Sequence, residues 1–281
     1  MTTNTEHIIN SLVNKAKELR KDIFKIICNA GGGHTPASLS IVEILVSLYD
    51  QILKIDPSNP GDPDRDRFIL SKGHASVALY AILADKGFFS KEELLTYGKK
   101  GTIFGGHPDM HKVSGVEAST GSLGHGLAFG VGMALAAKLD KKDFRVFTLL
   151  GDGECQEGSV WEAAMFAPQQ RLDNLIAIID YNKLQAMDWL DNIVSLEPMA
   201  GKWKAFGWAV REVAGNSLTQ LIEVFQQVPF EQGKPSAIIA HTTKGKGISF
   251  MEKVPIWHYR QPNKQEMIQA RNELGISAET E

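Results

Sequence analysis

The sequence predicts an α/β fold in which a central, mostly parallel sheet carries helices on both faces. Two apolar runs, Val146–Leu150 and Leu175–Ile179, show no alternation of polar and apolar residues. That pattern is typical of strands buried on both faces of a parallel sheet. The segment between them, Glu157–Gln170, has the composition of a helix, and Ser236–His241 is a further apolar run. Strands that alternate with helices in this way indicate the α/β class.

Length and composition are those of an ordinary globular chain. The 281 residues are 43% hydrophobic and 22% charged, so a single domain over residues 1–281 is expected. A net charge of -3 gives no indication of a nucleic-acid partner. Cys28 and Cys155 lie far apart and form no CxxC pair, which favours a reducing, cytoplasmic location over a disulfide scaffold or structural zinc.

The first residues do not have the pattern of a targeting segment. MTTNTEHIIN lacks a basic stretch followed by an apolar core, so no signal peptide is expected. No apolar run reaches the roughly 18 residues of a membrane span. The sequence therefore predicts neither secretion nor a membrane partner.

The amino-terminal part begins with two predicted helices separated by glycines. Over His7–Asn29, apolar residues recur every three or four positions, and Gly31–Gly33 ends the pattern. The same spacing predicts a helix over Ser40–Leu53. A short strand at Arg67–Ser71 and a helix over Ala75–Lys86 follow.

The remaining elements surround the central unit. A glycine-rich loop, Ser119–Gly126, opens a helix over Leu127–Lys138. Gly130 and Gly132 lower the helix propensity there, which suggests tight packing against a neighbour. The tail, residues 276–281, is expected to fray. Beyond the central unit we expect, before the last strand, a helix at Lys202–Phe206, a strand at Trp208–Val213 and a helix at Ser217–Gln227.

Polar residues at the ends of the two central strands predict a metal and diphosphate site. Ligands of open α/β sheets bind at this edge, and Mg²⁺ takes oxygen ligands from carboxylates, amides and carbonyls. Asp152, Asn182 and the carbonyl of Leu184 offer such oxygens. Gly151 and Gly153 allow a diphosphate to approach the backbone, and the next helix directs its amino terminus there. The alternative is a surface turn followed by an Asx turn.

Three histidines occupy glycine-rich turns where elements meet. His34 follows three glycines, His74 lies between a strand and a helix, and His107 lies in a glycine-broken loop. Each could face a ligand, or could make an ordinary local hydrogen bond. Lys244 follows the last strand and could contact a diphosphate or belong to a basic turn, whereas spacing alone does not interpret His258.

Taken together, these stretches resemble the amino-terminal, diphosphate-binding part of transketolase. The resemblance runs over nearly the whole chain in the order of the family, and it implies a thiamine diphosphate-binding fold. The segments that carry it are GGGHTPASLS (31–40), FILSKGHASVALYAIL (68–83), FGGHPDMHKVSGVEASTGSLGHG (104–126), GDGECQEGSVWEAA (151–164), LIAIIDYNKL (175–184) and TTKGKGISFMEKVPIWH (242–258).

The resemblance also implies two cofactors, thiamine diphosphate and Mg²⁺, for which Ca²⁺ or Mn²⁺ can substitute. Metal ligands are implied at Asp152, Asn182 and the Leu184 carbonyl. Contacts to thiamine diphosphate are implied at His74, Gly121, Leu123, Gly151, Asp152, Gly153, Glu157, Asn182, Lys244 and His258. Among these, Gly121 and Leu123 match the backbone along the aminopyrimidine, and Glu157 matches a carboxylate near the subunit interface.

A catalytic role is implied for His34, His107 and His258. In the family, matching histidines bind sugar hydroxyls and assist proton transfer, for which imidazoles are suited near neutral pH. We therefore expect His34, His74, His107 and His258 to converge on one cleft.

Three departures from the family pattern qualify the resemblance. Thr-Pro-Ala follows His34 where Pro-Gly is frequent, and Ser122 replaces a frequent proline. The chain also ends at Glu281, before the family's pyrimidine-binding and carboxyl-terminal domains. The matched motifs contain no candidate for the carboxylate that activates the aminopyrimidine. A partner chain, in a heterotetramer, is expected to supply those domains.

The expected function is therefore that of one subunit of a split transketolase. Such an enzyme transfers a two-carbon ketol unit from a ketose or ketose phosphate to an aldose acceptor, and it is active only with its second subunit. One alternative is the alpha subunit of a 2-oxo acid dehydrogenase first component, which shares the metal motif but not these histidines. Another is a noncatalytic cofactor-binding or regulatory subunit.

Overall fold

Five parallel strands form the centre of the protein in the computed structural model, which describes residues 3–277. Their order is β1-β2-β3-β5-β4, and each neighbouring pair runs parallel. The predicted parallel α/β sheet is therefore confirmed. The strands are β1 (Arg67–Leu70), β2 (Val146–Gly151), β3 (Leu175–Tyr181), β4 (Ala209–Ala214) and β5 (Ser236–His241).

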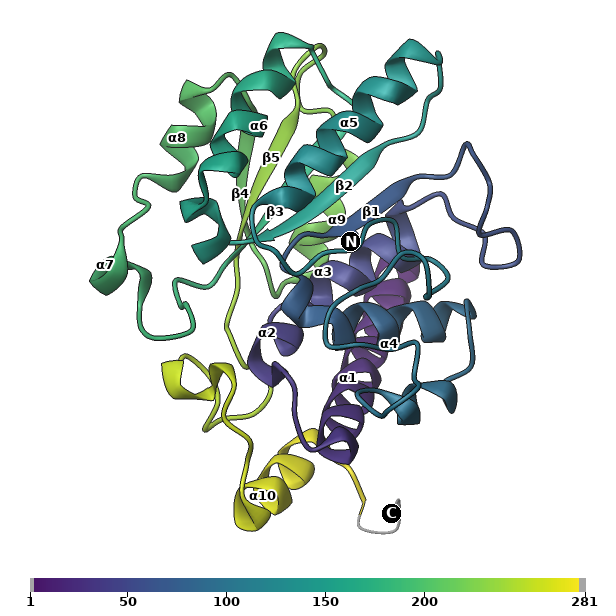
Figure 1. Ribbon diagram of the computed structural model, residues 1–281, viewed down its shortest axis with the longest axis vertical. Helices are drawn as coiled ribbons and strands as arrows, with labels where there is room; N and C mark the ends of the chain where they lie inside the picture. The colour runs from purple at the N-terminus through teal and green to yellow at the C-terminus, as the bar shows by residue number, and fades with distance from the viewer. Residues whose placement is uncertain (1–2, 278–281) are drawn as a thin grey trace.

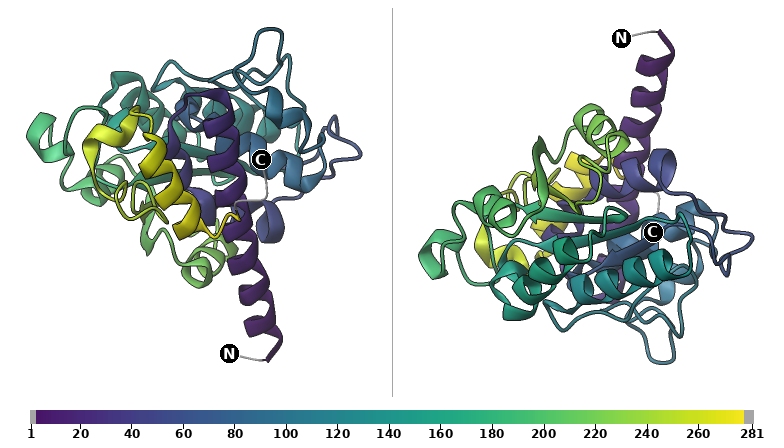
Figure 2. Two further views of the ribbon diagram at one scale, coloured as in Figure 1. Left: turned by 90° about the horizontal axis from the view of Figure 1, so that it is seen from below. Right: turned by 90° about the horizontal axis from the view of Figure 1, so that it is seen from above.

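Helices cover both faces of this sheet (Figures 1 and 2). One face carries α5 (His125–Leu139), α6 (Gly158–Gln169) and α8 (Met199–Ala205). The other carries α1 (Thr3–Ala30), α3 (Val42–Ser47), α4 (Ser76–Lys86) and α9 (Leu218–Gln226). Shorter or peripheral helices are α2 (Thr35–Leu39), α7 (Leu190–Ile193) and α10 (Lys264–Leu274).

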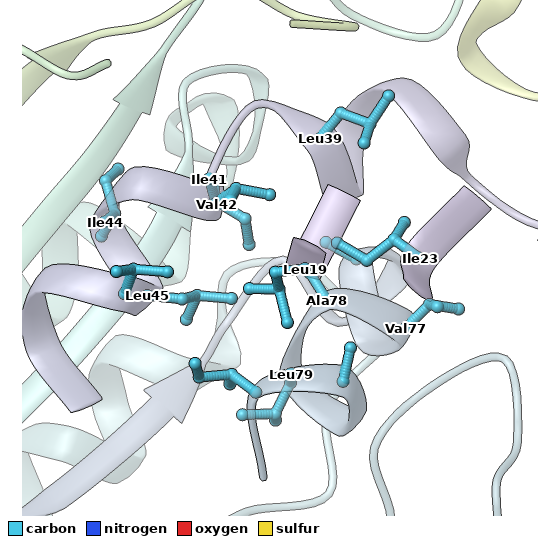
Figure 3. Close-up of a cluster of buried hydrophobic side chains, with 14 of the residues drawn as sticks. Leu19, Ile23, Leu39, Ile41, Val42, Ile44, Leu45, Val77, Ala78 and Leu79 are labelled. Carbon is cyan, nitrogen blue, oxygen red and sulfur yellow. The ribbon is translucent and has the colours of Figure 1, made fainter. Parts of the chain in front are cut away.

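The unbroken apolar runs are explained by two separate cores. Side chains alternate between the faces of a strand, so Phe147 and Leu149 enter one core while Val146 and Leu150 enter the other. Figure 3 shows part of the first core, where side chains of α1, α3 and α4 pack together. Every residue of β3 is buried, because both faces of this central strand are covered.

The predicted helix over Ser40–Leu53 is confirmed, although it begins two residues later than expected and ends in a π-helical turn. What the sequence did not predict is α2, which forms immediately after His34, and the bend at Ser40 and Ile41 that separates it from α3. The Ser40 hydroxyl donates to Asp180 at 2.8 Å. This contact with a strand distant in sequence accompanies the bend, and local spacing could not reveal it.

The packing expected of the two glycines in α5 is confirmed for Gly130 alone. A β-carbon on Gly130 would lie 2.5 Å from Thr148 Oγ1, so the helix approaches β2 closely there. A β-carbon on Gly132 would have no heavy atom of a neighbouring segment within 4 Å. Its side of α5 is exposed and makes no tight contact within the described chain.

Several other boundaries differ from prediction. The helix expected at Lys202–Phe206 is α8, which begins three residues earlier, directly after Pro198. Helix α10 had no sequence-based prediction, although Asn263 and Glu266 form a capping box at its start. The tail expected to fray lies partly outside the described residues, at 278–281.

The amino-terminal end of α1 projects away from the rest of the molecule (Figure 2). Beyond β5, the chain passes α2 on its way to α10 (Figure 1). Among the helices of the described residues, none is long and apolar enough to cross a membrane.

Candidate active site

A cavity of about 320 Å³ lies at the carboxyl ends of the strands. Every residue that the sequence singled out for the site lines it, although these residues come from many separate segments. They are His34, His74, His107, Gly121, Leu123, Gly151, Asp152, Gly153, Glu157, Asn182, Leu184, Lys244 and His258.

Asp152 occupies the floor of this cavity at the end of β2. It is 3% exposed, and its carboxylate accepts hydrogen bonds from the backbone N–H groups of Gly153 at 2.7 Å and Lys183 at 2.5 Å. Burial and the neighbouring Asp180 carboxylate raise the pKa of Asp152 to about 7. A cation would relieve this repulsion, so the carboxylate suits a metal ligand.

Asn182 and Leu184 lie beside Asp152 because β2 and β3 are adjacent in the sheet. The Asn182 amide N–H donates to Asp180 at 3.1 Å, which fixes the orientation of the amide group. Its oxygen accepts from the Leu184 N–H at 3.1 Å and keeps a second lone pair. The Leu184 carbonyl accepts from the Lys244 ammonium at 2.9 Å.

Two buried lysines bring positive charge to the same end of the cavity. Lys244 also donates to His258 Nδ1 at 3.0 Å, and burial together with Lys72 lowers the pKa of Lys244 to about 8. Lys72 forms a fully buried ion pair with Asp180 at 2.5 Å. Together the lysines and carboxylates form a mixed-charge floor that suits a metal–diphosphate complex.

Four histidines form a cluster above this floor. The ring centroid of His34 lies 5.2 Å from that of His74, 6.4 Å from that of His107 and 5.3 Å from that of His258. The rings of His74 and His258 are 5.5 Å apart. The expected convergence on one cleft is therefore met by the geometry.

Burial keeps most of this cluster neutral. It lowers the pKa of His34 to about 4, with His107 as the next cause, and that of His258 to about 3, with Lys244 as the next cause. Burial and Lys72 lower the pKa of His74 well below its usual value. Neutral imidazoles can both accept and donate protons, as a site that moves hydroxyl protons requires.

These pKa values predict acid-sensitive folding. Between the unperturbed value of 6.5 and the lowered values near 4 and 3, the unfolded chain binds protons that the folded chain excludes. Stability should therefore fall as the pH drops below about 6.5. Thermal unfolding at pH 7 and pH 5 measures how much stability is lost between these two values. The variants His34→Asn and His258→Asn should each reduce that loss. Replacing the exposed His7 should leave the loss of stability unchanged. An equal reduction in that control would contradict the conclusion that the buried histidines cause the loss.

The glycine-rich loop forms one wall of the cavity. Gly121 has a φ of +144°, and a β-carbon there would lie 2.9 Å from the His107 ring, so a larger residue would displace that histidine. Leu123 and Gly124 follow, and a β-carbon on Gly124 would lie 2.7 Å from that of Glu157. Glu157 is exposed at the cavity rim, immediately before α6.

The backbone N–H groups of Gly151 and Gly153, two residues predicted to contact the cofactor, already donate hydrogen bonds within the chain. The Gly153 N–H donates to Asp152 at 2.7 Å, and the Gly151 N–H donates to Glu154 at 2.9 Å. Both residues line the cavity as predicted. Their amides therefore also hold the turn that presents the Asp152 carboxylate.

Sequence reasoning gave no role to several residues of the cavity wall, among them Lys72, Glu154, Asp180 and Gln185. Asp180 is fully buried and accepts from Ser40, Lys72, Asn182 and Thr242. A signal for Asp180 existed, since its carboxylate stands near the end of an otherwise largely apolar, buried strand. Its partners, however, lie between 2 and 140 positions away.

Comparison with known proteins agrees with this arrangement. Residues 9–281 match a family described as transketolase, thiamine diphosphate binding domain. The chain belongs to the transketolase family. The predicted resemblance and the thiamine diphosphate-binding fold are thereby confirmed, and the chain is a transketolase amino-terminal domain.

Relatives within the transketolase family include separate subunits of similar length. The chain is 44% identical over 266 residues to an apulose-4-phosphate transketolase subunit of Phocaeicola vulgatus, covering 95% of this chain and 94% of that protein. It is 48% identical over 241 residues to the 6-deoxy-6-sulfo-D-fructose transketolase subunit SqwG of a Clostridium species, covering 86% and 88% respectively. These names fit a transketolase built from two chains.

Longer transketolases contain the same domain as a part. A solved mutant transketolase from Pichia stipitis superposes with a TM-score of 0.90 at 28% identity, covering 95% of this chain and 41% of that one. A transketolase from Campylobacter jejuni gives a TM-score of 0.89 at 32% identity, covering 95% and 43%. Nothing in these comparisons supports the 2-oxo acid dehydrogenase or regulatory alternatives.

Proposed function

We propose that this chain is the diphosphate-binding subunit of a split transketolase that transfers a two-carbon ketol unit from a ketose or ketose phosphate to an aldose. The observation that carries the proposal is the meeting of the Asp152 and Asn182 oxygens, two buried lysines and four histidines in one cavity. The family, together with its relatives that are separate subunits of similar length, supports the same function.

The residues of the cavity floor fit thiamine diphosphate and a hard divalent cation. Asp152 and Asn182 would hold Mg²⁺, for which Ca²⁺ or Mn²⁺ can substitute, with the Leu184 carbonyl as a third oxygen ligand. Lys244 and His74 would face the diphosphate, while Gly121 and Leu123 would lie along the aminopyrimidine. When bound, the cofactor would supply the electron sink needed to break and form carbon–carbon bonds.

The histidine cluster would handle the protons of the sugar. Because the imidazoles of His34 and His258 are neutral at pH 7, they can accept a proton from a substrate hydroxyl and return it. His107, whose ring lies 6.4 Å from that of His34, would bind a neighbouring hydroxyl. These roles suit a polar, hydroxyl-rich sugar substrate.

A second chain would complete the site. Helices α5 and α6 lie side by side in one layer (Figure 1). They expose apolar side chains, among them Phe129, which is 46% exposed, Met165 at 54% and Phe166 at 43%. Obligate interfaces are apolar and typically exceed about 2,000 Å². We therefore assign this face to contacts between chains in a heterotetramer whose other chains carry the pyrimidine-binding and carboxyl-terminal domains.

Reconstitution tests the proposal. The purified chain alone should be inactive, and activity on a ketose phosphate should appear when a second chain carrying the missing domains is added. The rate should saturate near a one-to-one ratio, because each complete site needs one of each chain. A single chain that turns over a ketose with normal dependence on thiamine diphosphate would contradict the split site.

The proposed cellular setting is the cytoplasm. Both cysteines, Cys28 and Cys155, are free thiols, and burial raises their pKa values, so both are protonated and poorly reactive. Unpaired cysteines of this kind suit a reducing compartment.

A further inference from the structure

Glu154 is a buried carboxylate to which the proposed chemistry gives no role. It lies in the short 3₁₀ turn between β2 and α6 and is 2% exposed. One carboxylate oxygen, Oε1, accepts from the Ser71 hydroxyl and from the Gly124 N–H at 2.9 Å. The other, Oε2, accepts from the Gly151 N–H at 2.9 Å. Both oxygens are therefore engaged.

The three donors belong to three different walls of the cavity. Ser71 follows β1, Gly151 ends β2, and Gly124 ends the glycine-rich loop at the start of α5. Two of these donors are backbone groups next to residues proposed to hold the cofactor, since Gly124 follows Leu123 and Gly151 precedes Asp152. A shift of either amide would move its neighbour directly.

Packing around this carboxylate leaves little freedom. A β-carbon on Gly126 would lie 2.3 Å from Ser71 Oγ, so the start of α5 rests almost directly on the end of β1. The Thr120 hydroxyl donates to the Leu70 carbonyl at 2.7 Å and attaches the other end of the loop to the same strand. Glu154 adds the connection between this loop and β2.

We propose that Glu154 is a positioning residue that holds the glycine-rich loop and the Gly151–Asp152 turn at a fixed separation, and thereby sets the width of the cofactor cavity. The effect on the cofactor rests on the proposed function, whereas the effect on the loop rests on the hydrogen bonds of this chain alone. A carboxylate is required because donors reach both of its oxygens, and an amide offers only one acceptor oxygen.

The variant Glu154→Gln tests this role at nearly constant volume. In either orientation of the amide, its NH₂ group faces the N–H of Gly151 or of Gly124, which loses its acceptor. Amide hydrogen exchange should therefore speed up at Gly124 or at Gly151, whichever N–H faces the NH₂ group, and stay unchanged in β5. The Kd for thiamine diphosphate at saturating Mg²⁺ should rise about 10-fold or more, as expected for a buried donor left unpaired.

Two matched variants separate positioning from general loss of packing. Glu162→Gln, at an exposed position on α6, should change neither measurement. Ser71→Ala removes only the hydroxyl donor and leaves both backbone amides paired, so its effect should be much smaller than that of Glu154→Gln. Equal effects of Ser71→Ala and Glu154→Gln, or unchanged exchange at Gly124 and Gly151 in Glu154→Gln, would overturn the proposal.

The experiment separates a failure of the proposed function from a failure of the positioning role of Glu154. A wild-type chain that fails to bind thiamine diphosphate would count against the proposed function, while the exchange data would still decide the role of Glu154. If Glu154→Gln does not fold, Glu154→Asp takes its place. The shorter aspartate side chain cannot reach all three donors, so the same local rise in exchange is expected. Unchanged exchange at both Gly124 and Gly151 in this variant would overturn the positioning role of Glu154.

Discussion

Replacing Asp152 with alanine should abolish the binding of thiamine diphosphate in the presence of Mg²⁺. The carboxylate is buried at the end of β2, beside the Asn182 amide. Without it, the metal loses its one proposed charged protein ligand, and the diphosphate charge is left poorly compensated. Isothermal titration calorimetry with thiamine diphosphate at saturating Mg²⁺ measures the effect directly, without any need for activity.

A matched control is available for this experiment. Asp143 is an exposed aspartate shortly before β2, so Asp143→Ala should bind the cofactor as the wild type does. Circular dichroism of both variants checks that each is folded. Undiminished affinity in a folded Asp152→Ala variant would remove Asp152 from the metal site.

Replacing Asp180 with alanine should cost more stability than any surface change, about 3–5 kcal/mol of the free energy of unfolding. The variant leaves the Lys72 ammonium, which is 2% exposed, buried without its charge partner. It also removes the acceptor of the Ser40, Thr242 and Asn182 donors. Four segments that meet at the cavity would lose their common contact.

Urea unfolding at pH 7 measures this loss. The double variant Lys72→Met/Asp180→Leu should be less destabilised than Asp180→Ala, because no unpaired charge remains buried. Asp143→Ala should lie within about 0.5 kcal/mol of the wild type, as exposed substitutions usually do. If Asp180→Ala lowered the free energy by no more than this control, the ion pair would not stabilise the fold.

The difference between what the sequence predicted and what it could not predict is clearest in the sheet and the segments that pack on it. Unbroken apolar runs predicted β2, β3 and β5, because strands covered on both faces need no polar residues. Periodicity predicted the helix after Ser40 but not the bend at Ser40 itself, where the hydroxyl donates to Asp180. An attraction across 140 positions has no trace in local spacing.

The candidate site divides in the same way. Local motifs and the family resemblance identified Asp152, Asn182 and the histidines, because glycine-rich turns at strand ends have a recognisable sequence. Where the side chains meet was decided by the fold. The order β1-β2-β3-β5-β4 brings the ends of strands distant in sequence to one edge.

The sequence by itself therefore determined the class of fold, the family and the residue types of the site, because these depend on composition, periodicity and short motifs. Only the tertiary structure decided which groups are paired. The Lys72–Asp180 ion pair, the Lys244 contact with Leu184 and the three donors on Glu154 each join segments brought together by packing. Burial then makes these pairings matter, since a charge or N–H removed from water must find its partner within the protein.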